Sequence, residues 1–177
     1  MDCILAINFT AAREQSVDRP TIVLQIDEVN SSKQLRTARH LLEEYWTSLG
    51  FDRETFGFGE ELDGLPGAYA RPEGRLALAV LSDQVVGCIA LRRLDNSSCE
   101  MKRLFVRQSA RGKGIALALL TWLVAEARSQ GYSRMLADTL PTMNDALRLY
   151  ERFGFTPVES YSPKPTPGAI YLQLKLR

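Results

Sequence analysis

The residues of clearest chemical meaning in this sequence are the six that read Arg111-Gly112-Lys113-Gly114-Ile115-Ala116. They follow a predicted strand, Cys99 to Val106, and precede a predicted helix, Ile115 to Arg128. Two glycines at such a turn let the main chain approach a ligand closely and direct several N–H groups at one point. The helix N-terminus adds partial positive charge, and Arg111 and Lys113 add full charges. The stretch therefore predicts a main-chain site for a phosphate or pyrophosphate group.

The spacing of the glycines excludes two common phosphate loops. A Walker loop has Ser or Thr after its Gly-Lys pair, but here Gly112-Lys113 is followed by Gly114. A dinucleotide fingerprint has a third glycine three residues after its second, where this chain has Leu117. What remains is the pattern Arg-x-x-Gly-x-Ala. For so short a motif, an ordinary tight turn that starts a helix is the alternative.

Two further segments place this loop in a longer pattern. The strand before it reads Glu100-Met101-Lys102-Arg103-Leu104-Phe105-Val106, and after it comes the run from Asn144 to Phe155, with Leu149-Tyr150 and Gly154-Phe155. In order and spacing, strand, loop, helix, strand and helix resemble the GNAT-type N-acetyltransferases. The loop is similar to the acyl-CoA pyrophosphate loop of that family. The resemblance covers roughly residues 21 to 177.

The resemblance implies an α/β (α+β) domain with the GNAT fold. Such a fold has a mixed central sheet of about six to seven strands, splayed between the fourth and fifth and flanked by about four helices. The domain would span residues 21–177. Residues 1–20 would form an N-terminal extension, either partly disordered or an added strand.

The resemblance also implies a site for acetyl-CoA as co-substrate. The pyrophosphate would lie on the loop residues Arg111, Gly112, Lys113, Gly114, Ile115 and Ala116. The pantetheine arm would pair like an added strand with the edge formed by Leu104, Phe105 and Val106, and Asn144 would hydrogen-bond to it. A main-chain N–H near Leu104 would polarise the thioester carbonyl. Core packing remains the alternative for Leu104 and Val106, and a polar first-turn residue the alternative for Asn144.

Acyl transfer to an amine needs a neutral amine, a stabilised oxyanion and a protonated leaving thiolate. Because an amine with a pKa of about 10.4 is mostly protonated at pH 7, a base assists the reaction. Glu100 matches an acidic position on the family's fourth strand, and an exposed carboxylate paired with Lys102 or Arg134 is its alternative. Tyr150 matches the family's general acid, and a helix tyrosine packed against its neighbours is its alternative.

An acidic segment before the central strands bears on the charge of the acceptor. It contains five carboxylates against one arginine: Asp52, Glu54, Glu60, Glu61 and Asp63 against Arg53. A negative rim at the acceptor site would attract a cationic amine, and a solvated helical face is the alternative. The aromatic residues of this region would line the same pocket or belong to the core: Trp46, Phe56, Phe58 and Tyr69.

Composition excludes several other classes of function. A chain of 177 residues with a net charge of +1 is the size of one domain and gives no reason to expect nucleic acid or a membrane surface as a partner. Its cysteines, Cys3, Cys88 and Cys99, lack metal-ligand spacing and indicate reduced thiols in a cytoplasmic protein, with Cys88 and Cys99 in the core. A single histidine, His40, argues against a His-based triad or a multi-His metal site, so no metal is expected.

Hydrophobic periodicity and turn residues predict the elements that position these residues. The predicted strands are 21–26, 75–81, 85–91, 99–106, 134–138, one from residue 155 onward, and 169–176. The predicted helices are one after the Ser31–Gln34 capping box that ends at Gly50, a short one at 60–65, one at 115–128, and one from Asn144 that Thr142 caps. Residues 82–84 would turn between the second and third strands.

These observations predict an N-acetyltransferase that moves an acetyl group from acetyl-CoA to a primary amine of a small molecule. Because no cysteine lies in a nucleophile motif, direct attack is favoured over a covalent intermediate. A non-catalytic acyl-CoA-binding or sensing module and a protein or peptide N-acetyltransferase are the alternatives. Transfer of a longer acyl group or to a hydroxyl also stays open, as does a homodimer.

Overall fold

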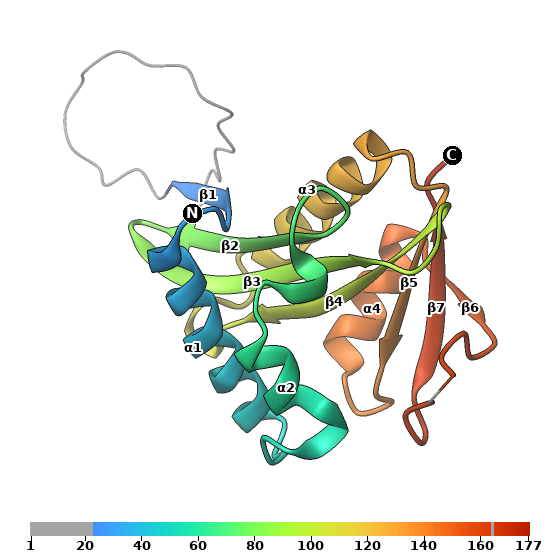
Figure 1. Cartoon of the computed structure of the whole chain (residues 1–177), viewed down its shortest axis with the longest axis horizontal. Helices are drawn as coiled ribbons and strands as arrows, with labels where there is room; N and C mark the ends of the chain where they lie inside the picture. Colours follow the sequence, from blue (N-terminus) through green and yellow to red (C-terminus); the bar gives the residue numbers. More distant parts are fainter. Residues whose placement is uncertain (1–22, 164) are drawn as a thin grey trace.

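The computed structural model describes residues 23–163 and 165–177, so the predicted extension, residues 1–20, lies outside the described residues. Within that part the chain forms seven strands and four α-helices (Figure 1). In chain order they are β1 (Leu24–Glu28), α1 (Ser32–Ser48), α2 (Phe58–Asp63), β2 (Arg75–Leu81), β3 (Gln84–Arg93), β4 (Ser98–Val106), α3 (Ile115–Ser129), β5 (Arg134–Thr139), α4 (Asn144–Phe153), β6 (Thr156–Val158) and β7 (Ile170–Lys175). No helix of the described residues is long and apolar enough to cross a membrane.

The strands form a single mixed sheet that opens between β4 and β5, which confirms the predicted fold. The strand order is β1-β2-β3-β4-β5-β7-β6, and β4–β5 is the one parallel pair among the described strands. These two strands pair only from Ser98 opposite Arg134 to Glu100 opposite Leu136. Beyond Glu100, β4 continues to Val106 without a partner on this side. The result is a wedge-shaped opening in the middle of the sheet (Figure 1).

Alternation along the strands divides the core into two layers. The face that α1 and α2 cover buries Leu76 and Leu78 of β2 and Cys88 and Ala90 of β3. The face that α3 covers buries the intervening residues, among them Ala77, Ala79, Ile89 and Leu91. Cys88 and Cys99 are both buried, so the prediction that they belong to the core is confirmed.

A β-bulge interrupts β4 at the level of the opening. Lys102 lies opposite Ala90, but Phe105 lies opposite Cys88, so β4 has one residue more than β3 over this stretch. Arg103 has a φ of 60°, in the left-handed region that residues other than glycine seldom adopt. Lys102 and Phe105 consequently face the α1 side although they are three residues apart, which an unbroken strand does not allow.

The start of α1 agrees with the prediction. The amide of Gln34 donates to Ser31 Oγ at 3.2 Å, and the Gln34 side chain accepts from the amide of Asn30. Of the predicted first strand, residues 21 and 22 lie outside the described residues, and β1 covers Leu24–Glu28. The short helix α2 begins earlier than predicted, at Phe58, because Gly57 adopts a left-handed φ of 73° and starts it.

Two predicted turns differ in detail from the structure. The β2–β3 turn consists of Ser82 and Asp83 alone, both with positive φ, and Gln84 already belongs to β3. The prediction that Thr142 caps α4 is wrong. Met143 occupies the N-cap position without a side-chain hydrogen bond, because its amide closes a turn onto the carbonyl of Leu140 and the helix begins one residue later.

Candidate active site

Two hollows meet where β4 and β5 part. The first, here called the groove, has a volume of about 980 Å³ and runs between the end of β4, the start of α3 and the start of α4. The second, here called the cavity, has a volume of about 530 Å³ and lies between the α1–α2 region and the residues Ser162, Pro165, Thr166, Ala169 and Tyr171. Tyr45, Leu49, Leu104 and Met143 line both. A ligand that lies along the groove can therefore place one end in the cavity.

The predicted phosphate loop forms one end of the groove. Arg111, Gly112, Gly114, Ile115 and Ala116 line it, whereas Lys113 is exposed beside it. Gly112 and Gly114 have φ values of 75° and 74°. The amides of residues 112–117 donate to no other group in the described part of the chain, so they remain available at the N-terminus of α3. This arrangement suits an anionic group such as pyrophosphate.

The unpaired edge of β4 forms the floor of the groove. Leu104, Phe105 and Val106 line it, and Asn144 faces it from the first turn of α4. Because β4 has no neighbour here, its main-chain groups can pair with an extended ligand. The side chains of Phe105 and Val106 are buried, so core packing and an open backbone edge coexist.

Tyr150 lies in the cavity close to its junction with the groove. Its side chain is buried and its ring packs against Phe155, with the ring centroids 5.4 Å apart. Among residues 23–163 and 165–177 no group hydrogen-bonds to its hydroxyl. Burial, with smaller contributions from Tyr45 and Asp138, raises the pKa of Tyr150 above its ordinary value. The phenol therefore stays protonated at neutral pH and can donate to a ligand.

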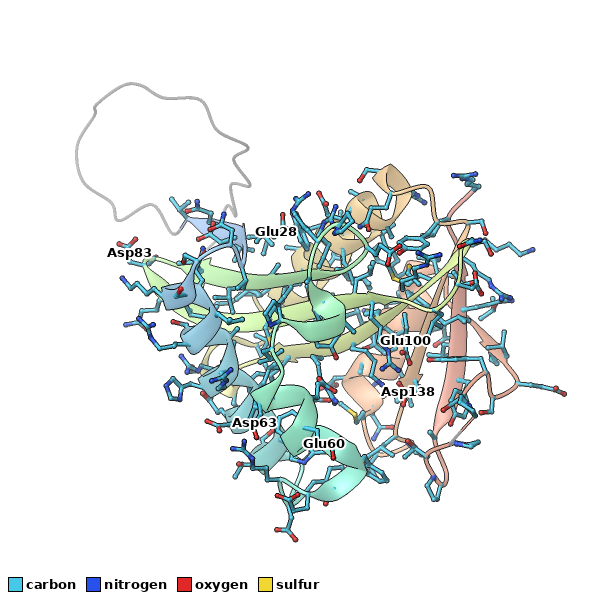
Figure 2. All side chains as sticks on the ribbon, in the orientation of Figure 1. Glu28, Glu60, Asp63, Asp83, Glu100 and Asp138 are labelled. Carbon is cyan, nitrogen blue, oxygen red and sulfur yellow. The ribbon has the colours of Figure 1, made fainter. Side chains whose placement is uncertain are left out.

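Glu100 is not the exposed carboxylate of the alternative interpretation. It is 2% exposed, and it lies with Asp138 where the two strands separate (Figure 2). Arg92 Nε donates to Glu100 Oε2 at 2.5 Å, and the Tyr161 hydroxyl donates to Oε1 at 2.9 Å. Of its two predicted partners, Lys102 lies 3.6 Å from Oε1, whereas Arg134 donates to Ser98 instead.

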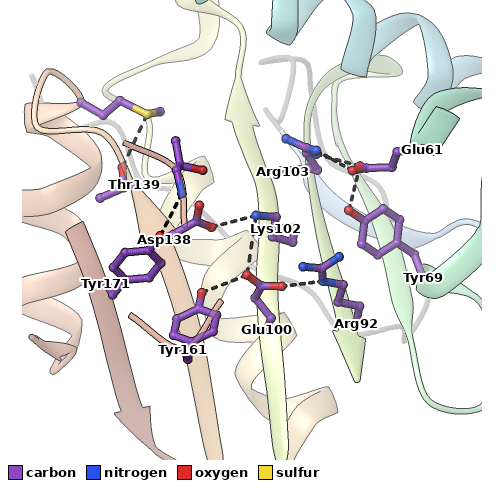
Figure 3. Close-up of polar contacts among 12 residues, drawn as sticks. Glu61, Tyr69, Arg92, Glu100, Lys102, Arg103, Asp138, Thr139, Tyr161 and Tyr171 are labelled. Carbon is purple, nitrogen blue, oxygen red and sulfur yellow. Dashed lines mark hydrogen bonds and ion pairs between the residues drawn. The ribbon is translucent and has the colours of Figure 1, made fainter. Parts of the chain in front are cut away.

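Asp138 is a site residue that sequence reasoning missed. Lys102 Nζ donates to Asp138 Oδ1 at 2.7 Å, across the opening between β4 and β5. Lys102 thereby links Asp138 to Glu100 and, through Glu100, to Arg92 and Tyr161 (Figure 3). The one signal in the sequence was a charged residue near the end of a predicted buried strand. Because β4 and β5 separate there, Asp138 becomes part of the cavity wall.

The segment that holds this loop, the splayed strands and the tyrosine matches a known protein family. The model of the acetyltransferase (GNAT) family matches residues 36–155. This chain belongs to the GNAT acetyltransferase family. With the family comes its activity: the chain is an acyltransferase that takes its acetyl group from acetyl-CoA.

Individual relatives agree with the family assignment. An uncharacterized N-acetyltransferase of Schizosaccharomyces pombe is 32% identical over 157 residues, which cover 86% of this chain and 95% of the relative. The structure of a GNAT acetyltransferase from Staphylococcus aureus has a TM-score of 0.74 at 20% identity, covering 87% of this chain and 99% of that one. A GNAT family acetyltransferase from Elizabethkingia anophelis with acetyl-CoA bound has a TM-score of 0.62 at 20% identity, covering 86% and 97%.

The acidic segment of this GNAT acetyltransferase does not form a negative rim around the cavity. Of its five carboxylates only Glu61 lines the cavity, and Arg103 and the Tyr69 hydroxyl both bond to it. Glu60 and Asp63 are exposed on α2 (Figure 2), and Asp63 pairs with Arg53. The basis for predicting a cationic acceptor is therefore absent.

The aromatic residues of the same region divide between cavity and core. Trp46 and Phe56 line the cavity, whereas Phe58 and Tyr69 are buried in the layer under α1 and α2. Trp46 and Phe58 stack with their ring centroids 4.3 Å apart. Among the described residues, no cluster of three or more His, Cys, Asp and Glu side chains could hold a metal ion.

Proposed function

We propose that this GNAT acetyltransferase acetylates a primary amine of a small molecule by direct attack. The observation that carries the proposal is the junction of groove and cavity. There the open edge of β4 at Leu104 and the unpartnered hydroxyl of Tyr150 border the same space. A thioester that enters along the groove would meet an amine that occupies the cavity.

The groove residues fit the co-substrate. The free amides at the start of α3 bind the pyrophosphate, with Arg111 beside them held by a hydrogen bond to the Val106 carbonyl at 3.1 Å. The edge of Leu104, Phe105 and Val106 pairs with the pantetheine arm, and Asn144 hydrogen-bonds to it. Acetyl-CoA supplies the activated acetyl group as a thioester.

In the chemical step, the nitrogen of the neutral amine attacks the thioester carbonyl carbon. The new C–N bond forms as the C–S bond breaks, and a main-chain N–H near Leu104 stabilises the negative charge on the carbonyl oxygen. Tyr150 gives its proton to the leaving thiolate and regains one from solvent. The amine loses its extra proton to a carboxylate of the cavity, so the products are an N-acetyl amine and a thiol.

The high pKa of Tyr150 does not prevent this transfer. A tyrosine has an ordinary pKa of about 10 and a thiol one of about 8.5. Burial raises the pKa of both groups because it disfavours both anions, as it does for the Cys88 thiol, whose pKa it raises to about 12. The difference between the pKa of the Tyr150 hydroxyl and the pKa of the leaving thiol therefore stays moderate when both groups are buried.

Two carboxylates are candidates for the base. Glu100 matches the position that the family resemblance indicated, but hydrogen bonds engage both of its oxygens. Asp138 Oδ1 accepts a hydrogen bond from Lys102, and Asp138 Oδ2 accepts none from the described residues.

The pH dependence of kcat should be compared between Glu100→Gln and Asp138→Asn. Loss of the base lowers kcat and removes the acidic limb of the kcat profile, whereas loss of a positioning residue lowers kcat at all pH values.

Direct attack is supported by the two cysteines that the structure describes. Cys88 and Cys99 are buried, and burial raises the pKa of each thiol to about 12. Neither provides a thiolate nucleophile at neutral pH. Incubation with acetyl-CoA alone, followed by intact-mass measurement, should show no acetylated protein. A stoichiometric acetyl adduct would contradict direct attack.

The lining of the cavity supports a small-molecule acceptor. Residues of the α1–α2 region line it on one side, and Pro165, Thr166 and Tyr171 line it on the other. The deciding experiment is a screen of amines, peptides and proteins with acetyl-CoA, read by thiol release and product mass. Turnover of peptides alone would favour a protein N-acetyltransferase. Tight acetyl-CoA binding without turnover would favour a sensing module. A cytoplasmic location and a homodimer remain predictions.

A further inference from the structure

The charged residues of the cavity that the structure describes balance one another. Among them, three cations and three anions line it: Arg92, Lys102 and Arg103, and Glu61, Glu100 and Asp138. Each belongs to an ion pair within this set. A set of described charges that sums to zero gives no electrostatic advantage to a polycation or a polyanion. It suits a neutral acceptor or one that carries both signs.

Two of these residues have unused hydrogen-bonding capacity. Arg92 donates to Glu100 through Nε, and neither terminal nitrogen of Arg92 donates to any other described group. Its side chain is 39% exposed and lines the cavity. Because the guanidinium is always charged and presents its donors in a fork, two free terminal nitrogens match a carboxylate.

Asp138 offers the opposite capacity. Asp138 lines the cavity, its Oδ1 accepts from Lys102, and its Oδ2 accepts from none of the described residues. Asp138 and Tyr150 line the same cavity. An acceptor oxygen beside the reacting end suits the ammonium group of an incoming amine.

The two residues lie at different places along the cavity wall. Arg92 is on β3, opposite Glu100, where β4 and β5 are still paired. Asp138 is on β5 beyond the last pair with β4, where the strands have separated (Figure 3). The free donors and the free acceptor are thus separated, with Lys102 and Glu100 between them.

We infer that the acceptor is a primary amine that also carries a carboxylate, with the carboxylate on the terminal nitrogens of Arg92 and the amine beside Asp138. This inference rests on the proposed function and names its substrate class. It also replaces the cationic acceptor that the acidic segment had indicated. Such a zwitterion matches both the charge balance of the cavity and its two unused groups.

The test compares matched acceptors that differ only in the carboxylate. A series of α- to ω-amino acids is assayed beside the amides of the same skeletons, with acetyl-CoA saturating. We expect the parent protein to prefer the acids. Arg92→Gln should lower kcat/KM for the acids by about 10- to 100-fold, mainly through KM, since a hydrogen-bonded charge pair is lost. Because Arg92 also pairs with Glu100, the same change should lower kcat/KM for the amides as well, but by a smaller factor than for the acids.

Matched variants separate recognition from structural damage. Arg93→Gln removes the next arginine of β3, which pairs with Glu73 and does not line the cavity, and should leave both acceptor classes unchanged. Arg92→Lys keeps a positive charge near Glu100 but loses the forked pair of donors. It should therefore restore any amide turnover that Arg92→Gln loses, but only part of the preference for acids over amides. An equal loss for acids and amides in Arg92→Gln, uncorrected in Arg92→Lys, would overturn the inference.

Binding without turnover distinguishes this inference from the proposed function. Calorimetry in the presence of coenzyme A compares an N-acetylated amino acid with its amide. Tighter binding of the acid, lost in Arg92→Gln, supports the carboxylate site even if no acceptor is acetylated, in which case the proposed function alone fails. Turnover with equal or better kcat/KM for amides and diamines would overturn the inference and leave the acetyltransferase activity intact.

Discussion

Arg103 on β4 donates two hydrogen bonds to Glu61 on α2, from Nε at 2.8 Å and from Nη2 at 2.5 Å. Arg103 is also the bulge residue with a φ of 60°, and its guanidinium lies 4.9 Å from the Trp46 ring. The pair joins the helix that borders the cavity to the bulge that precedes Leu104. Burial alone would raise the pKa of Glu61. The hydrogen bond from Arg103 and its positive charge nevertheless hold that pKa below its ordinary value.

The first prediction concerns this pair. Glu61→Gln removes the negative charge and leaves Arg103, whose side chain is 10% exposed, without a counter-ion. The free energy of unfolding should fall by about 3 kcal/mol, because an unpaired buried charge is costly. Urea denaturation at pH 7 measures it. Glu60→Gln, an exposed neighbour on the same helix, is the matched control and should change stability by less than about 0.5 kcal/mol.

The same variant should change the response to acid. A carboxyl group whose pKa is lower in the folded state than in the unfolded state stabilises the protein at pH values above its unfolded-state pKa, which is 4.5 for Glu61. This stabilisation is lost as the pH falls through the folded-state pKa. The parent should therefore lose stability below pH 4.5 more steeply than Glu61→Gln does. Parallel stability curves in acid would contradict a Glu61 carboxylate held by Arg103.

The second prediction tests the phosphate loop. Gly114 starts α3 with a φ of 74°, and Gly114→Asp places a side chain and a negative charge among the free amides. Acetyl-CoA affinity should fall by at least about 100-fold, which corresponds to about 2.7 kcal/mol. Gly131→Asp, at the opposite end of α3 with a φ of 86°, carries the same kind of backbone strain away from the groove. Equal acetyl-CoA affinities in the two folded variants, measured by calorimetry, would reject the loop assignment.

The third prediction concerns the proton donor. Tyr150→Phe keeps the packing against Phe155 but removes the hydroxyl, so kcat should fall by about 10- to 1,000-fold with acetyl-CoA binding little altered. Tyr132→Phe removes another buried tyrosine hydroxyl, which donates to the Glu73 carbonyl, and should leave kcat unchanged. If Tyr150→Phe turns over at the parent rate with chemistry rate-limiting, Tyr150 is a packing residue only.

Local patterns in the sequence identified most of the residues that line the groove. The loop, the β4 edge and Tyr150 are each written in a short continuous stretch, and the capping and stop signals of the helices are local as well. Such features survive folding because they depend on neighbours within a few residues. Most of the residues named for the groove side do line the groove, with Lys113 beside it, and their roles toward acetyl-CoA stay predictions.

The cavity half could not be predicted in this way. Arg92, Lys102 and Asp138 meet only through the strand register and the splay, and no single-sequence pattern encodes either. The bulge at Arg103 was hidden because it uses a residue that is not glycine. The prediction from the acidic segment was wrong because only three of its carboxylates lie on α2, and of these only Glu61 lines the cavity while Glu60 and Asp63 are exposed.

The fourth prediction concerns stability at alkaline pH. Cys88 lies on β3 beside the bulge, where its Sγ donates to the Arg103 carbonyl at 3.3 Å. Burial raises the pKa of its thiol from 9.0 to about 12, with Arg103 opposing the shift. A group whose pKa is higher in the folded state stabilises the protein fully below the unfolded value, and this contribution disappears as pH rises toward the folded value. The parent should lose about 1.4 kcal/mol per pH unit from this thiol above pH 9.

Cys88→Ala should remove that part of the pH dependence while costing about 1 kcal/mol at pH 7 through lost packing. Urea denaturation of both proteins with a reductant, at several pH values between 8 and 10.5, compares the slopes directly. Cys99→Ala is a second test of the same effect in the layer under α3, since burial raises the pKa of that thiol to about 12 as well, and it should reduce the alkaline slope by a similar amount. Equal alkaline slopes in the parent and in Cys88→Ala would mean that solvent reaches the thiol. The argument that Cys88 is too poor a thiolate to act as a nucleophile would then no longer hold.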